Sequence, residues 1–120
     1  MKQSFSYTIA LIGLVFCLSS CHTAAPRFDY KALAKASVRL GMDIELTDNH
    51  KLYINAAGWI GTPYRPGGDS KHGTDCSGLV SQLYKKTYRI HLSRSTDGQL
   101  KESHRIARRN LREGDLVFFT

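Results

Sequence analysis

Between residues 61 and 75 the sequence reads GTPYRPGGDSKHGTD, with four glycines and two prolines in fifteen positions. A helix cannot run through such a segment, because proline lacks the amide proton that a helix needs and glycine loses the most backbone entropy when it is ordered. The segment therefore predicts a long loop that divides the chain. Loops of this length without structure of their own are often functional, so a site is expected beside it.

Two helices are predicted before this loop. Apolar residues at helical spacing predict one helix over about residues 29–40, and Gly41 suits its C-terminal cap. A second helix is predicted over about residues 49–60, with Asp48 as its candidate N-cap.

Further elements are predicted after the loop. Apolar residues three, four and seven positions after Cys76 predict a helix that begins there, and a short helix is expected to begin near Ser95. The stretch LREGDLVFFT predicts a turn at Glu113–Gly114 and a strand from Asp115 to Phe119. A strand needs partners for its backbone groups, so we expect a sheet that is interrupted after its first core strand, in a truncated gene product. The alternative is a complete small helical protein with one edge strand.

The N-terminal stretch MKQSFSYTIALIGLVFCLSSC has the pattern of an export signal. Lys2 precedes an apolar run that is too short to span a bilayer core of about 30 Å. The segment Leu18–Cys21 resembles the bacterial lipobox, whose cysteine is acylated after cleavage, and the alternative is a plain signal peptide with a chance cysteine. We expect residues 1–20 to be the signal, 21–28 the lipidated N-terminus and tether, and 29–120 a single domain.

This processing would leave one free thiol. Cleavage removes Cys17 and acylation uses Cys21, so Cys76 stands alone and no intramolecular disulfide can form. Cys76 and His72 together provide only two possible metal ligands where a structural zinc site needs four, so neither a metal site nor a cofactor is predicted. The net charge of +7 favours acidic partners such as anionic lipid or acidic polymers. Export argues against nucleic acid as a partner.

Cys76 admits two interpretations, a buried structural residue or a nucleophile. A cysteine in the first turn of a helix favours the second, because the unpaired amides and the helix dipole favour a thiolate there. The same amides are suitable oxyanion donors. Asp75 is placed to cap this helix.

Four sequence blocks bear on this choice: GTPYRPGG, TDCSGLV, SRSTDGQ and LREGDLVFF, in this order and spacing. Together they resemble the NlpC family of bacterial cell-wall cysteine endopeptidases, of the papain-like superfamily, over about residues 50–120. The resemblance implies an α+β fold with N-terminal helices packed on an antiparallel sheet. It also implies a small lipoprotein that cleaves peptidoglycan stem peptides. Such a protein is expected in the cell envelope, anchored to the outer membrane and facing the periplasm.

The resemblance also implies roles for individual residues. Cys76 matches the nucleophile, and Tyr64 matches a tyrosine that helps to hold the reacting carbonyl. Asp75 and Ser77 match positions that contact the substrate amine in some members. Simpler roles remain open, because Tyr64 suits loop packing and Ser77 suits helix amides.

The block SRSTDGQ matches a PR(S/T)xxQ motif of the family. Arg94 falls on its arginine and is expected to contact substrate or oxyanion, with a structural ion pair as the alternative. Gln99 is expected to be structural. Ser93 stands where the family usually has proline, which predicts a less rigid loop.

A cysteine peptidase needs a histidine base, which the resemblance places on a strand after the GDLVFF block, with a third polar residue to orient it. None of this chain's histidines aligns with that position. We therefore expect the 120-residue form to be inactive. The histidines are His22, His50, His72, His91 and His104.

Two other functions remain open. One is a non-catalytic envelope lipoprotein that binds acidic cell-wall polymer or anionic lipid, and the other is a papain-like acyltransferase or amidase. The binder would use a basic segment whose simpler interpretation is a solvated face. The basic residues are Lys101, Arg105, Arg108, Arg109 and Arg112.

Overall fold

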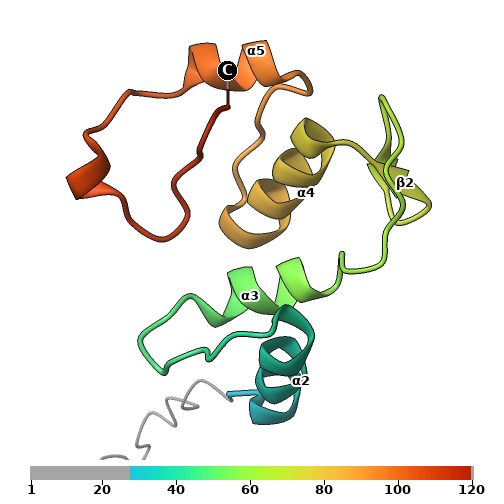
Figure 1. Cartoon of the computed structure of the whole chain (residues 1–120), viewed down its shortest axis with the longest axis vertical. Coiled ribbons are helices and arrows are strands. Elements are labelled where there is room, and N and C mark those ends of the chain that lie inside the picture. The colour runs from blue at the N-terminus through green and yellow to red at the C-terminus, as the bar shows by residue number, and fades with distance from the viewer. Residues whose placement is uncertain (1–27, 120) are drawn as a thin grey trace, which may run out of the picture.

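The computed structural model describes residues 28–119 (Figure 1). The expected signal, Cys17, Cys21 and nearly all of the expected tether lie outside these residues. None of the helices in the described part of the chain is long and apolar enough to cross a membrane. The elements are α2 (Tyr30–Leu40), α3 (His50–Ala57), β1 (Asp69–Ser70), β2 (Gly73–Thr74), α4 (Cys76–Tyr88), α5 (Thr96–Glu102) and a 3₁₀ turn, η1 (Arg108–Asn110).

The first two helices agree with the sequence predictions except at the boundaries of α3. Gly41 ends α2 in the left-handed conformation with φ +66°, as predicted. The N-cap of α3 is Asn49, whose side chain accepts from the amide of Leu52 at 3.1 Å. The prediction of Asp48 was wrong, because that carboxylate turns back and accepts from the amide of Glu45 at 2.8 Å. The helix also ends at Ala57, three residues earlier than predicted, and the chain turns from Gly58 onward.

The glycine-rich loop contains a small sheet that the sequence did not predict. Strands β1 and β2 pair antiparallel, and Tyr64 forms a parallel bridge to Thr74. The amide of Arg65 donates to the carbonyl of Thr74 at 2.9 Å. The chain passes so close to itself that a Cβ on Gly73 would lie 2.7 Å from the Cβ of Arg65. Two-residue strands are too short to show an alternating pattern, which is why periodicity missed them.

The fold class is α+β, as expected. The strand predicted for residues 115–119, however, does not form. No ladder partner for this segment lies within residues 28–119, and a strand exists only through such pairing. The predicted turn before it is present, with Gly114 at φ +89°. The hydroxyl of Tyr84 donates to the carbonyl of Gly114 and ties the turn to α4.

Helix α4 is the centre of the described fold. It contacts α3, β1 and α5, while α2 packs on α3 (Figure 1). Asn55 of α3 donates to the hydroxyl of Thr87 of α4 at 3.0 Å. The apolar core is small, and four polar residues are buried as well. Within residues 28–119 the buried apolar side chains are Leu33, Ala36 and Ala57, and the buried polar side chains are Thr74, Ser77, Thr87 and Gln99.

Candidate active site

The site is built around the N-terminus of α4. Asp75 is the N-cap, as the sequence predicted, and its Oδ1 accepts from the amide of Gly78 at 2.8 Å. Its Oδ2 accepts from the amide of Gly67 at 2.8 Å. One carboxylate therefore caps the helix and also holds the glycine-rich loop against it.

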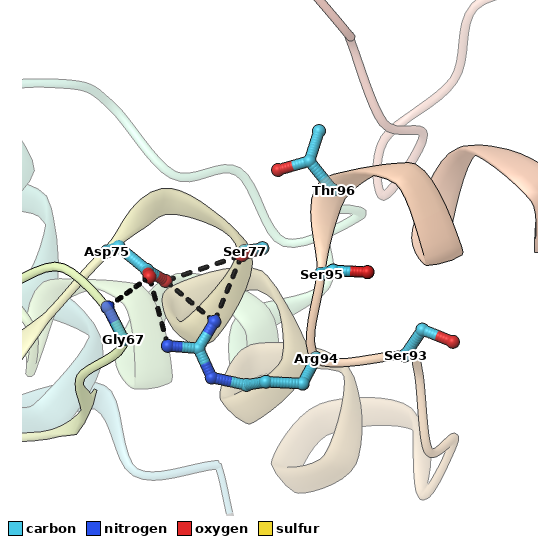
Figure 2. Close-up of a pocket in the computed structure, with 7 residues that line it drawn as sticks. All are labelled: Gly67, Asp75, Ser77, Ser93, Arg94, Ser95 and Thr96. Carbon is cyan, nitrogen blue, oxygen red and sulfur yellow. Dashed lines mark hydrogen bonds and ion pairs between the residues drawn. The ribbon is translucent and has the colours of Figure 1, made fainter.

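Arg94 completes this arrangement from the other side, as Figure 2 shows. Its guanidinium pairs with Asp75 through Nη1 at 2.8 Å and Nη2 at 3.0 Å, in the forked geometry that makes such pairs strong. It also donates to the hydroxyl of Ser77 at 3.0 Å and to the carbonyl of Gly68 at 2.7 Å. The structure thus shows the ion pair that the sequence offered as one role of Arg94, while its contact with substrate or oxyanion stays a prediction.

The ion pair has electrostatic consequences for both partners. The hydrogen bond from Arg94 holds the pKa of Asp75 well below its usual range, with help from the amides of Gly78 and Gly67. The same hydrogen bond raises the pKa of Arg94. Asp75 is therefore a permanent anion at neutral pH, so it serves as an acceptor and not as a general acid.

Gln99 positions the segment that carries Arg94. It is buried, and its Nε2 lies 2.9 Å from the carbonyl oxygens of Ser77 and Ser93 and 3.1 Å from the hydroxyl of Ser81. This confirms the structural role that the sequence suggested. Gln99 thus joins α5, the first turns of α4 and the Ser93–Arg94 segment through one amide group.

Ser93, which stands where the family usually has proline, attaches its loop to α5, and the expected lower rigidity of this loop stays a prediction. Its amide donates to Glu102 at 3.0 Å, and its hydroxyl donates to the same carboxylate. These bonds lower the pKa of Glu102. A proline at this position has no amide proton and could not make the first bond.

Cys76 is the first residue of α4 and is exposed, which rules out the buried structural interpretation. Its Sγ lies 4.0 Å from the hydroxyl of Thr96. Within residues 28–119 the amides of Cys76 and Ser77 have no hydrogen-bond acceptor. The thiol therefore sits beside two unused donors at a helix N-terminus.

An open pocket of about 500 Å³ lies beside these residues. Of the predicted site residues, Asp75, Ser77 and Arg94 line it, whereas Cys76 and Tyr64 do not. The Tyr64 side chain is 75% exposed. No histidine lines this pocket, and no group of three His, Cys, Asp or Glu side chains among residues 28–119 could hold a metal ion. The lining residues are Gly67, Asp75, Ser77, Ser93, Arg94, Ser95 and Thr96.

Sequence reasoning assigned no site role to Thr96, Ser95 or Gly67. The available signal was membership of the blocks GTPYRPGG and SRSTDGQ, which contain all three. The blocks alone do not say which of their side chains face α4, because that depends on how α5 packs.

Comparisons with known proteins cover the region that contains the site. The sequence profile described as the NlpC/P60 family matches residues 61–120. The "Murein DD-endopeptidase MepS/Murein LD-carboxypeptidase" of Escherichia coli (strain K12) is 44% identical over 63 residues, which are 52% of this chain and 34% of that protein. The chain therefore matches about a third of the length of that relative.

Two relatives match over nearly the whole chain. The "Probable endopeptidase NlpC" of Escherichia coli (strain K12) is 30% identical over 94% of this chain and 67% of its own length. The "Probable endopeptidase NlpC homolog" of Haemophilus influenzae is 29% identical over 92% of this chain and 73% of its own length.

Proposed function

The chain belongs to the NlpC/P60 family, and we propose that it forms the nucleophile-bearing part of a cysteine peptidase that cleaves amide bonds in peptidoglycan stem peptides. The substrate is inferred from relatives that are named murein endopeptidases. The observation that carries the proposal is the exposed thiol of Cys76 in the first turn of α4.

The proposed reaction begins with attack of the Cys76 sulfur on the carbonyl carbon of a stem-peptide amide. A carbon–sulfur bond forms, and negative charge develops on the carbonyl oxygen, where the amides of Cys76 and Ser77 are suitable donors. The carbon–nitrogen bond then breaks, and the amine leaves with a proton. Water hydrolyses the resulting thioester and regenerates the thiol.

The proton transfers require a base, and family resemblance assigns this role to a histidine on a strand after the GDLVFF block. Among residues 28–119 no histidine lines the pocket. We propose that the residues described here provide the nucleophile, the donors and the Asp75–Arg94 pair, and that the 120-residue chain alone does not turn over muropeptides.

The nucleophile is tested by the rate at which iodoacetamide alkylates Cys76 near neutral pH, followed by peptide mass mapping. We expect faster alkylation than for glutathione, because the Cys76 thiol is exposed and lies in the first turn of α4 beside the amides of Cys76 and Ser77, which are unpaired within residues 28–119. The 120-residue chain should give no turnover of purified muropeptides. A chimera that adds the part of the Escherichia coli relative after the matched segment should give turnover that Cys76→Ala abolishes.

Two outcomes would contradict this assignment. Alkylation slower than that of glutathione would favour a non-catalytic binding protein, and cleavage that survives Cys76→Ala would exclude Cys76 as nucleophile. The variant Lys86→Ala serves as a control in the same helix, because it changes an exposed side chain that does not line the pocket.

We also propose that Cys21 carries a lipid and anchors the protein in the cell envelope, at the outer membrane and facing the periplasm. The lipobox-like segment Leu18–Cys21 supports this. Metabolic labelling with a radioactive fatty acid in a bacterial host should mark the protein, and Cys21→Ala should remove the label. Undiminished labelling of that variant would refute the anchor.

A further inference from the structure

The segment that follows α5 forms an exposed basic loop, which we call the arginine loop (residues 104–112). It contains four arginines and no carboxylate, and all of its residues are exposed. In Figure 1 it extends away from the helices as a wide loop that connects α5 to the C-terminal residues. The arginines are Arg105, Arg108, Arg109 and Arg112.

Both ends of the arginine loop are attached to the helices. At the first end the hydroxyl of Ser103 donates to the carbonyl of Gln99 at 2.7 Å. At the other end the carboxylate of Glu113 accepts from the amide of Asn49 at 3.0 Å, and Tyr84 bonds to Gly114. The loop therefore projects from a defined base.

The carboxylates that flank the loop are engaged elsewhere. Glu102 bonds to Ser93, Glu113 bonds to the amide of Asn49, and Asp115 accepts from the backbone amide of Arg112 at 2.7 Å. Within residues 28–119 none of the four guanidinium groups of the loop forms a hydrogen bond or an ion pair. Their charge is available to an external anionic partner.

Two apolar side chains are exposed among these charges. Ile106 is 47% exposed and Leu111 is 45% exposed. Cations beside exposed apolar groups suit the membrane interface, where the apolar groups enter the headgroup boundary and the cations meet anionic headgroups. A soluble acidic polymer would pair with the arginines but would offer no apolar phase to Ile106 and Leu111.

We propose that the arginine loop docks on an anionic phospholipid surface. This docking is independent of the peptidase activity and of acylation at Cys21. Docking would also affect the position of the site, because α5 connects the site to the loop. The first residue of α5, Thr96, contacts Cys76, and its last residue, Glu102, lies two positions before the loop. Seven helical residues span roughly 10 Å, so a docked loop would hold the Cys76 thiol close to the membrane surface.

The test measures binding of the full chain to vesicles of phosphatidylcholine alone and of phosphatidylcholine mixed with phosphatidylglycerol. The comparison of the two lipid compositions isolates the electrostatic part of the binding, because apolar segments bind to both kinds of vesicle. We expect tighter binding to the anionic vesicles at low ionic strength, and loss of this preference in high salt. Arg108→Gln/Arg109→Gln should reduce the preference roughly tenfold to thirtyfold.

A matched control is Lys31→Gln/Lys35→Gln, which removes two exposed charges from α2. It should leave the preference within a factor of about two, because these lysines lie outside the loop. An equal loss in both double variants would show that net charge alone is responsible and would overturn the proposal. The proposal is also overturned if the unaltered chain shows no preference for anionic vesicles. Circular dichroism checks that each variant remains folded.

A third variant separates lipid from acidic polymer. Ile106→Ser/Leu111→Ser should weaken binding to anionic vesicles severalfold, because it removes the groups that enter the interface. Its binding to soluble polyglutamate should be unchanged. If vesicle binding is also unchanged and polyglutamate competes fully with the vesicles, the partner is an acidic polymer and the lipid proposal fails.

Discussion

Gly78→Ala is expected to destabilise the protein by about 2 kcal/mol, although alanine is the better helix former by about 1 kcal/mol. A Cβ at this position of α4 would overlap the carbonyl oxygen of Gly68 and lie 3.0 Å from Asp75 Oδ1 and Thr74 Oγ1. If the loop moves away, the Gly68 carbonyl loses its bonds from the amide of Asp75 and from Arg94. These bonds are worth more together than the gain in helix propensity.

Urea unfolding measures this change, with Lys86→Ala as the control. Lys86 lies on the same helix and is exposed, so its substitution should change the free energy of unfolding by less than about 0.5 kcal/mol. A more stable Gly78→Ala variant would show that helix propensity decides at this position. It would also contradict the close approach of the loop to α4.

Gln99→Met is expected to lower the free energy of unfolding by about 2–3 kcal/mol. Methionine has nearly the same length and shape but cannot donate to Ser77, Ser81 or Ser93, and Gln99 is only 2% exposed. Water cannot replace the lost bonds at so closed a position. Because Ser93 precedes Arg94, the Asp75–Arg94 pair should loosen as well.

The control for this prediction is Gln82→Met, the same chemical change on α4. Gln82 is half-buried, and within residues 28–119 its side chain forms no hydrogen bond, so we expect little change. Equal effects of the two substitutions on the urea midpoint would mean that side-chain burial is responsible and that the amide of Gln99 contributes nothing.

The helices of this protein were largely predictable because their signals are local. Apolar spacing, Gly41 as a C-cap and Asp75 as an N-cap are all properties of neighbouring residues. The choice between Asp48 and Asn49 as the cap of α3 was not predictable, since both residue types suit the position. Asp48 instead caps the turn at Glu45, a contact that depends on how the preceding connector folds.

The sheet was predicted in the wrong place for a related reason. Residues 115–119 have the composition of a strand, but within the described chain they have no neighbour to pair with. The strands that do form are two residues each and consist of polar and glycine positions. Strand pairing joins segments through their backbones, so composition alone did not decide which segments would pair.

For the site, the sequence by itself placed Cys76 at a helix N-terminus and associated it with a known set of motif blocks. Those inferences need only helical periodicity and the order of residues along the chain. The tertiary structure alone decided that Arg94 pairs with Asp75, nineteen positions away, and that Gln99 holds both segments together. It also left Tyr64 outside the pocket lining. Contacts between distant segments depend on how α4, α5 and the glycine-rich loop pack, and no local pattern in the sequence records that packing.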